Sequence, residues 1–405
     1  MTRDLFLLAA CQYPAGMLDR TPQSKLGAAA HDGPATAALQ RWSGPAFAAR
    51  RRMGERFDRR RPRPTALLWA GDRIYIDATA GLLDPLAALG ASPARSGPVP
   101  SPGDDPQYLA LVRAYQAVER QWPYPMQLEQ HLHVGLDDHE IVDNWEPSAD
   151  PRRQAALDRL RQTSVAAHLA LRPGQDRGAA LWGASTHGGW PLFTIDTRTE
   201  RSVRSPSTLD TARLIGDAQW PALQHWLRQP VARPHRLLLS PAILLPRRLT
   251  TSEHPAGALR SDAWDGYPAS LHDLLATLAD EQVQGCVFLS GDEHLACVVR
   301  AEVWREGKGG EDRKVRFWSV HTGAMYAPYP FANGRPEGFS DETEFGFRSA
   351  VSGSAAHYRC RLERRFGPPD TDGFVSVELD RQAPSGSDPQ VRLHGADGVD
   401  YGLLP

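Results

Sequence analysis

Short apolar runs separated by helical stretches constrain the fold of this chain more than any other feature of its sequence. Each run has the length of a buried strand, and strands that alternate with helices form mainly parallel sheets. The pattern therefore predicts an α/β protein with a largely parallel sheet. The runs that predict strands are Leu5–Ala10, Ala66–Ala70, His133–Leu136, Leu192–Ile195, Leu237–Ser240, Val287–Ser290 and Phe317–Val320.

Helix signals lie between these runs. Asp105-Pro106 and Asp150-Pro151 each combine an N-cap residue with a proline at the first helical position. The predicted helices are Pro106–Gln121, Arg152–Leu171, Leu209–Arg228 and Ser270–Glu281. The stretch from about 370 to 405 differs, because Phe374–Leu379 alternates and Val391–Leu393 follows among turn residues. It predicts antiparallel strands that close the fold.

Residue types that bind metals follow four of the runs at their carboxyl ends. Cys11 follows the first run, Asp72 the second, Asp138 the third, and Asp292 and His294 follow Val287–Ser290. In open α/β sheets, ligands bind at the edge formed by the carboxyl ends of the strands. If the four strands are parallel neighbours, these five side chains meet at one edge.

Each of these signals is weak when it is taken alone. A Gly-Asp pair after a strand is usually a turn, and a buried cysteine usually acts as a small apolar side chain. The run Asp137-Asp138-His139-Glu140 is more informative. Three carboxylates around one imidazole repel one another unless cations neutralise them or protons are taken up. The run predicts bound metal, and its imidazole suits a hydrolytic site.

A set of motifs in a fixed order carries a resemblance to a known family. The motifs are Cys11-Gln12-Tyr13-Pro14, Gly71-Asp72-Arg73-Ile74-Tyr75-Ile76-Asp77, Asp137-Asp138-His139-Glu140-Ile141 with Asn144-Trp145, Asp196-Thr197-Arg198, Trp264-Asp265-Gly266-Tyr267 and Leu289-Ser290-Gly291-Asp292-Glu293-His294. Together they resemble the PhoD-type alkaline phosphatases, a branch of the calcineurin-like metallophosphoesterases. Met325-Tyr326-Ala327-Pro328 and Pro330-Phe331-Ala332-Asn333 are similar to a late motif of that family.

The resemblance implies the fold and the activity. It implies a four-layer αββα sandwich of the metallophosphoesterase type, with mixed sheets and flanking helices, as a single domain over residues 1–405. Residues 12–65 are long for the family and form an elaborated segment. The implied activity is hydrolysis of phosphate mono- or diesters by attack of a metal-activated water, on a small molecule or a phosphodiester.

The resemblance also implies iron(III) and calcium(II), with other divalent metals as alternatives. Cys11, Asp72 and Tyr75 would form the iron side, with Asp72 as the bridge. The side chains that would complete the cluster are Asp138, Asp292 and His294. Asn144 and Asp77 are further candidates at the metals.

Two residues are assigned to the substrate, His139 by the same resemblance and Arg198 because it follows a predicted strand. His139 would bind the phosphoryl oxygens or protonate the leaving oxygen. Arg198 would contact the phosphate, although an internal pair between Asp196 and Arg198 that fixes a loop is the favoured alternative. A catalytically silent metal-binding scaffold of the same fold is the alternative function. The enzyme is favoured because every expected position holds a competent ligand type.

The sequence departs from the wider superfamily at two motifs. Cys11 stands where most members have Asp-x-His, as in the PhoD branch. Gly291-Asp292-Glu293-His294 stands where the superfamily has Gly-His-x-His, so that a carboxylate replaces one imidazole. A carboxylate favours harder metals at this position.

Charge and hydropathy exclude some classes of partner. The formal net charge is −2, so specific nucleic-acid binding is not expected, despite an arginine cluster between Arg50 and Arg63. No apolar run reaches the roughly 18 residues of a membrane span. Leu8-Ala9-Ala10-Cys11 resembles a lipoprotein cleavage box, but the run before it is short for a signal peptide. The chain as written is expected in the cytoplasm, although the family is often exported.

Overall fold

A computed structural model gives the structure of the protein. It describes residues 3–13, 45–56, 64–76, 106–119, 132–171, 180–248, 250–307, 313–327 and 334–403. Asp77, most of the 12–65 segment and the run from Pro328 to Asn333 lie outside the described residues.

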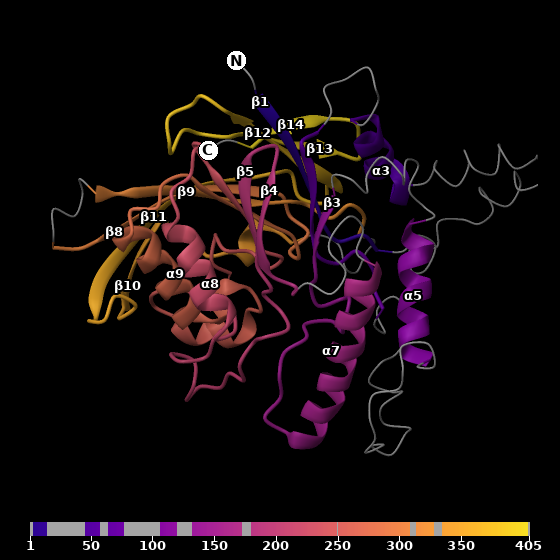
Figure 1. Ribbon diagram of the computed structural model, residues 1–405, viewed down its shortest axis with the longest axis horizontal. Helices are drawn as coiled ribbons and strands as arrows, with labels where there is room; N and C mark the ends of the chain where they lie inside the picture. The colour runs from indigo at the N-terminus through magenta and orange to yellow at the C-terminus, as the bar shows by residue number, and fades with distance from the viewer. Residues whose placement is uncertain are drawn as a thin grey trace, which may run out of the picture.

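Two sheets form the centre of the molecule (Figure 1). The six-stranded sheet contains β1 (Arg3–Ala9), β2 (Ala66–Ala70), β3 (Leu132–Gly135), β12 (Gly373–Asp380), β13 (Gln390–Gly395) and β14 (Asp400–Gly402). Its strand order is β14-β13-β12-β1-β2-β3. The strands β1, β2 and β3 are parallel, whereas β12, β13 and β14 continue the sheet in antiparallel pairs.

The eight-stranded sheet has the order β10-β11-β8-β9-β7-β6-β5-β4. Its strands are β4 (Gly183–His187), β5 (Trp190–Thr194), β6 (Arg236–Leu239), β7 (Cys286–Ser290), β8 (Cys297–Arg305), β9 (Val315–His321), β10 (Glu344–Ser349) and β11 (Ala356–Phe366). The strands β5, β6, β7 and β9 are parallel, and the strands at both edges are antiparallel.

Helices cover the outer face of each sheet. The helices are α3 (Pro45–Glu55), α5 (Pro106–Glu119), α7 (Pro151–Leu171), α8 (Gln219–Arg228) and α9 (Pro268–Asp280). Apolar side chains of α3, α5 and α7 pack on the six-stranded sheet, and those of α8 and α9 pack on the eight-stranded sheet. This arrangement confirms the predicted sandwich of two sheets between two helical layers.

Alternate side chains of β1 pack in two different apolar layers, one on each face of the six-stranded sheet. Phe6 and Leu8 point into the apolar layer between the sheets, and Leu7 and Ala9 point toward the helices. Successive side chains of a strand point to opposite faces, so a strand that is apolar at every position must be covered on both. The run Leu5–Ala10 is therefore continuous because its strand is internal to the sandwich.

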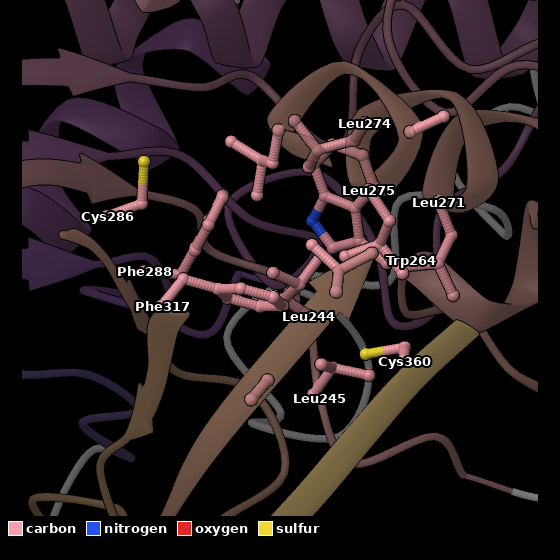
Figure 2. Close-up of a cluster of buried hydrophobic side chains, with 14 of the residues drawn as sticks. Leu244, Leu245, Trp264, Leu271, Leu274, Leu275, Cys286, Phe288, Phe317 and Cys360 are labelled. Carbon is pink, nitrogen blue, oxygen red and sulfur yellow. The ribbon is translucent and has the colours of Figure 1, made fainter. Parts of the chain in front are cut away.

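The eight-stranded sheet packs on α9 through a buried apolar cluster (Figure 2). Leu274 and Leu275 of α9 meet Phe288 of β7 and Phe317 of β9, and all four are buried. Burying a side chain of this size contributes about 1.5–3 kcal/mol. The indole nitrogen of Trp264, which lies in the same cluster, donates to the Ser240 hydroxyl over 2.9 Å. The polar atom of this tryptophan is thus satisfied inside the apolar layer.

The predicted apolar runs all fall on observed strands, but the sheet itself differs from the prediction. The prediction of a largely parallel sheet is wrong, because the structure has two sheets and both contain parallel and antiparallel strands. The strand β11 shows why the antiparallel part escaped the sequence analysis. Its buried positions alternate with exposed ones such as Arg359 and Arg361, which is typical of a strand with one solvated face.

The predicted helix Leu209–Arg228 is also corrected, because α8 begins only at Gln219. The amide of Leu214 donates to the Ser270 hydroxyl over 2.9 Å. The amide of Gly216 donates to Glu200 over 3.1 Å. Side chains from other segments thus satisfy the backbone that a longer helix would have paired internally.

Part of the arginine cluster anchors α3 to the six-stranded sheet. Arg52 donates to the carbonyl of Val399 over 2.9 Å and to the Asp400 carboxylate over 2.7 Å. An Arg56 nitrogen lies 2.8 Å from Nδ1 of His394. These two arginines are used inside the protein. No helix within the described part of the chain combines the length and apolar character needed to cross a membrane.

Candidate metal centre

Four loops meet at one end of the sandwich. They follow β1, β2 and β3 of the six-stranded sheet and β7 of the eight-stranded sheet. The sequence analysis expects these side chains to meet if the four strands are parallel neighbours, and that condition does not hold, because β7 belongs to the other sheet. The loops still meet because the sheets stack with these ends together: the amide of Asp292 donates to Sγ of Cys11 over 3.2 Å, across 281 residues of sequence.

Two glycines allow this close approach. Gly71 has a φ of +86°, and a Cβ atom there would lie 2.4 Å from Cβ of Asp137. A Cβ atom on Gly291 would lie 2.3 Å from Cβ of Ala10, on the facing sheet. Larger residues at these positions would push the loops apart, so the glycines of both motifs are required by packing.

One part of the site combines a thiol, a phenol, an imidazole and a carboxylate. Cys11 Sγ lies 3.4 Å from Oδ2 of Asp72. The Tyr75 hydroxyl lies 3.1 Å from Nε2 of His294. Ligand atoms of Cys11, Asp72 and His294 lie within 4.8 Å of one another. This is the set of side chains that the resemblance places on the iron side, together with His294.

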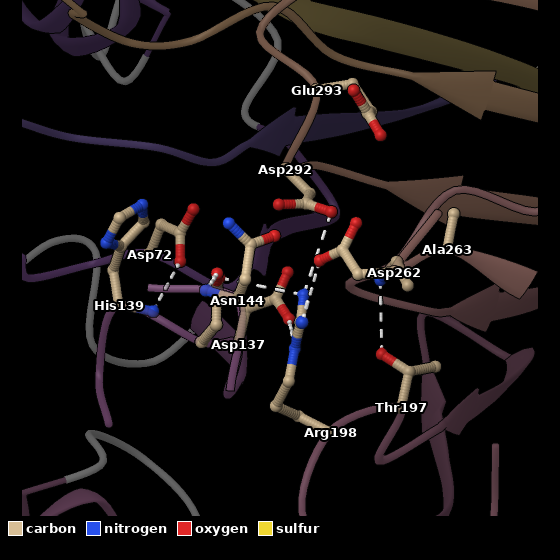
Figure 3. A network of polar contacts seen from close by, with 12 residues as sticks. Asp72, Asp137, His139, Asn144, Thr197, Arg198, Asp262, Ala263, Asp292 and Glu293 are labelled. Atoms are coloured by element: carbon tan, nitrogen blue, oxygen red, sulfur yellow. Dashed lines mark hydrogen bonds and ion pairs between the residues drawn. The ribbon is translucent and has the colours of Figure 1, made fainter. Parts of the chain in front are cut away.

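The other part of the site is a group of carboxylates around a guanidinium (Figure 3). Ligand atoms of Asp72, Asp137, Asp138 and Asp292 lie within 4.8 Å of one another. Asp72 belongs to both parts of the site.

Burial and mutual repulsion oppose ionisation of this cluster. Burial, together with the neighbouring carboxylates, raises the pKa of Asp72 and of Asp292 well above the usual range. Burial and the charge of Asp72 likewise raise the pKa of Cys11, and burial and the Cys11 charge raise that of Tyr75. Cations bound among these groups would reverse the effect, because they favour the charged forms.

The described side chains fit bound cations. Oδ2 of Asp137 and Oδ1 of Asp138 are buried without a hydrogen-bond partner. Buried carboxylate oxygens are normally paired or bound to metal. Thiolate, phenolate and imidazole donors beside several carboxylates can serve one softer and one harder cation. The donor set therefore fits a centre of two or more metals.

Strained backbone is concentrated at the same place. Non-glycine residues rarely adopt positive φ. Among the described residues that do so, Cys11, Asp72, Asn144, Asp292 and His294 have φ values of 57°, 54°, 52°, 85° and 53°. Such strain persists where the surrounding structure fixes it, typically at functional sites.

His139 lies at the edge of the carboxylate group. Its amide donates to Oδ1 of Asp72 over 3.4 Å, and its ring stacks on Tyr75 with centroids 4.0 Å apart. The ring nitrogen Nε2 lies 3.9 Å from Asp143. A ligand atom of His139 also lies within 4.8 Å of Asp72 and Asp138. The position allows an imidazole to reach either a cation or a bound phosphoryl group.

Asn144 approaches the cluster through its backbone. Its amide donates to Oδ2 of Asp138 over 2.6 Å, and its side-chain nitrogen donates to Asp143 over 3.0 Å. Asn144 therefore fixes one oxygen of Asp138.

Arg198 is enclosed by carboxylates, and its side chain is fully buried. Its nitrogens lie 2.5 Å from Asp137 and 2.8 Å from Asp262. They lie 3.6 Å from Asp138 and 3.7 Å from Asp292. Asp196 accepts from the backbone amide of Arg198, whereas the guanidinium contacts the four carboxylates named above. Despite opposing desolvation, these carboxylates hold the pKa of Arg198 above its ordinary value.

Three further acidic residues at the site are not among the predicted ligands, although one of them, Glu140, belongs to the run of carboxylates that predicts metal. Asp262 pairs with Arg198, and Arg198 and Arg201 hold its pKa low although burial opposes this. Glu293 forms an ion pair with Arg248. Glu140 accepts hydrogen bonds from three backbone amides. The only signal for Asp262 was its place three residues before Asp265 of the Trp264-Asp265-Gly266-Tyr267 motif.

Comparisons with known proteins agree with this architecture. The family model for PhoD-like phosphatases matches residues 35–337. Among solved structures, a structure of PhoD has 13% identity and a TM-score of 0.55, covering 100% of this chain and 72% of its own. GAP50, the anchor in the inner membrane complex of Plasmodium, has 12% identity and a TM-score of 0.37, covering 100% of this chain and 89% of its own. The first likeness shows a shared fold, and the second is too low to carry an argument. No curated protein matches the chain significantly.

Proposed function

Because this chain belongs to the PhoD-like phosphatase family, we propose that it is a metal-dependent phosphoesterase that hydrolyses phosphate mono- or diesters at the candidate metal centre. One observation carries the proposal. Thiol, imidazole and carboxylate ligand atoms lie within 4.8 Å of one another, burial raises the pKa of Cys11, Asp72 and Asp292, and two carboxylate oxygens there lack hydrogen bonds. Such an arrangement is stable when cations neutralise it.

We propose iron(III) and calcium(II) as the metals. Cys11, Asp72 and Tyr75 would hold iron, with Asp72 shared, and the remaining ligands would be Asp138, Asp292 and His294. When bound, the cations would lower the pKa of a water molecule and neutralise charge on the phosphoryl oxygens. Asn144 is proposed to orient Asp138, since its amide donates to that carboxylate.

The side chains of the protein supply orientation and proton transfer. His139 is proposed to bind a phosphoryl oxygen or to protonate the leaving oxygen. Its stacking on Tyr75 fixes the plane of the ring. A ring fixed in this way keeps one nitrogen directed to the same point during turnover.

Arg198 is proposed to act as a buried counter-charge. Its contacts with Asp137, Asp138, Asp262 and Asp292 occupy the guanidinium. Removing one partner of a buried ion pair leaves an uncompensated charge and destabilises a protein by about 3–5 kcal/mol. The favoured role of Arg198 is thus to hold the carboxylates in place, and direct phosphate contact would require it to leave them.

Metal analysis combined with an esterase assay tests the proposal. Purified protein should contain iron and calcium, and it should hydrolyse p-nitrophenyl phosphate or bis(p-nitrophenyl) phosphate. Removal of the metals with a chelator should abolish turnover, and calcium and iron should restore it. Bound metal without turnover on either ester would instead support the silent scaffold. Turnover that survives complete metal removal would contradict the proposal.

A further inference from the structure

We infer that Glu140 is the positioning residue that holds the loops carrying Asp72 and Asp138 at a fixed separation. The sequence places Glu140 among the carboxylates that repel one another. In the structure its side chain is fully buried, yet it belongs to none of the carboxylate groups that share a candidate cation position within the described residues. Its two oxygens are directed at backbone amides instead.

The contacts of Glu140 bridge two loops. Oε2 accepts from the amides of Asp72 and Asp137, over 3.0 Å and 2.9 Å. Oε1 accepts from the amide of Arg73 over 2.6 Å. Asp72 and Arg73 follow β2, whereas Asp137 follows β3. One carboxylate thus ties together the two loops that present candidate ligands from neighbouring strands.

Backbone hydrogen bonds continue this connection on both sides. The amide of Ile76 donates to the carbonyl of His139 over 3.0 Å, which again joins the second and third loops. The amide of Gln12 donates to the carbonyl of Asp72 over 2.9 Å, which joins the first loop to the second. Glu140 adds side-chain hydrogen bonds to these backbone contacts. One of them is accepted from the amide of Asp72, whose φ is positive.

The chemistry of the contacts requires a carboxylate rather than an amide. Three N–H donors converge on two oxygens, and a carboxylate is an acceptor at both. A glutamine has the same shape, but its NH₂ group would face an N–H donor in place of one acceptor. Outer groups that orient metal ligands typically change metal affinity or activity about 10- to 100-fold when they are removed.

Hydrogen–deuterium exchange on the metal-free protein tests the positioning role directly. In Glu140→Gln, the amides of Asp72, Arg73 and Asp137 should exchange faster, by about 10- to 100-fold, the effect of losing a hydrogen bond to a charged group. Amides of β6, β7 and β9 should keep their protection and thereby show that the fold is intact. Glu146→Gln is the matched control, because Glu146 lies in the same segment but pairs with Arg204 over 2.9 Å.

A second readout rests on the proposed function. With p-nitrophenyl phosphate and limiting calcium, Glu140→Gln should lower kcat about 10- to 100-fold and leave KM nearly unchanged. Excess calcium should restore much of the loss, because the variant binds metal more weakly but keeps its ligands. A purely structural defect would lower activity and thermal stability without rescue by metal.

The outcomes separate this inference from the proposed function. If the wild-type protein lacks esterase activity, the proposed function fails, and exchange at the three amides still decides the role of Glu140. If Glu140→Gln does not fold, Glu140→Asp keeps the charge on a shorter side chain and should show the same local increase in exchange. Wild-type exchange rates at Asp72 and Arg73 in a folded variant would overturn the inference.

Discussion

The two ends of β7 lie in different surroundings: one end is packed among apolar side chains, and the other leads into buried charged groups. At its beginning, Cys286 and Phe288 lie in the apolar cluster against α9, where the indole of Trp264 has a hydrogen-bond partner. Beyond its carboxyl end, Asp292 and His294 have positive φ and lie in the candidate metal centre. One end stabilises the fold, whereas the other is strained and charged, as functional sites commonly are.

The two thiols at these ends make the comparison concrete. Burial raises the pKa of Cys286 to about 12. Burial also raises the pKa of Cys11, but there the charges of Asp72 and Asp292 contribute. Cations bound at the centre would offset both effects at Cys11, whereas Cys286 lies in the apolar cluster. Substitutions at the charged end should therefore change metal content and turnover, whereas those at the apolar end should change the free energy of unfolding.

Asp72→Asn should produce the largest effect on activity. The substitution keeps the shape of the side chain and removes the charge that lets two cations share it. Metal content and nearly all turnover should be lost. The metal-free variant should be at least as stable as the wild type, because one repelling carboxylate is gone. Metal analysis, an esterase assay and denaturant unfolding measure these quantities, and retention of more than a few per cent of activity would contradict the assignment.

His139→Ala should separate turnover from metal binding. If His139 acts on the substrate, kcat should fall roughly 100- to 10,000-fold, the usual range for a positioned acid–base group, while metal content stays unchanged. His225→Ala is a suitable control, because His225 is an exposed histidine on α8 that contacts Gln229. Loss of metal together with activity would show that His139 is a ligand.

Leu275→Ala should give the opposite result at the apolar end. Leu275 is buried in the cluster of Figure 2, so its truncation should lower the free energy of unfolding by about 2–5 kcal/mol. Activity per folded molecule should remain that of the wild type. Denaturant unfolding and a turnover assay at low temperature measure both effects. A large fall in kcat without a change in stability would contradict the view that the apolar end of β7 contributes to stability and not to turnover.

The stabilisation given by metal should grow as pH rises. Burial raises the pKa of Asp137 and of Glu293 to about 7, from ordinary values of 3.8 and 4.5. The folded metal-free protein thus binds these protons more tightly than the unfolded chain does, and it loses this stability as pH rises from about 4 to about 7, by about 1.4 kcal/mol per pH unit for each proton. Cations bound nearby would favour the ionised form of these carboxyl groups.

Three buried histidines change the stability of the protein with pH in the opposite direction. The pH dependence of the metal-free protein alone therefore does not test this prediction. Burial lowers the pKa of His272, His321 and His394 to about 4, so their contribution to stability rises with pH toward the unfolded value of 6.5. These histidines are present with and without metal. The difference between the melting temperatures of the two forms is therefore the quantity to measure, and a difference that shrinks between pH 5 and pH 8 would contradict the prediction.

Cys11→Ser and Cys286→Ser should give the smallest but most selective difference. A thiolate and a phenolate on iron(III) give a visible charge-transfer band. Cys11→Ser should weaken retention of iron more than of calcium, and Tyr75→Phe should shift or bleach the band. Cys286→Ser should leave the metals in place and lower stability by about 1–3 kcal/mol, since it buries a hydroxyl. A colourless, fully active protein with only zinc or magnesium would contradict the proposed iron.

Local sequence was enough to predict the positions of the internal strands and the residues that follow them. The apolar runs mark β1, β2 and β7 because these strands are covered on both faces, which requires apolar side chains at successive positions. The exposed face of β11 gives no such run, and the residues before α8 have a helical pattern but form turns. Where burial is one-sided or where side chains from other segments satisfy the backbone, the local pattern does not settle the structure.

The sequence by itself determined which chemical groups this protein offers: a thiol, a phenol, carboxylates and imidazoles, each directly after a strand, in the order typical of a phosphatase family. Only the tertiary structure decided how they are used. It brought Asp292 from a second sheet to Cys11, enclosed Arg198 among four carboxylates and directed Glu140 at backbone amides. Strand order and side-chain direction depend on pairing between distant segments, so the residues of one loop cannot specify which partners they will face.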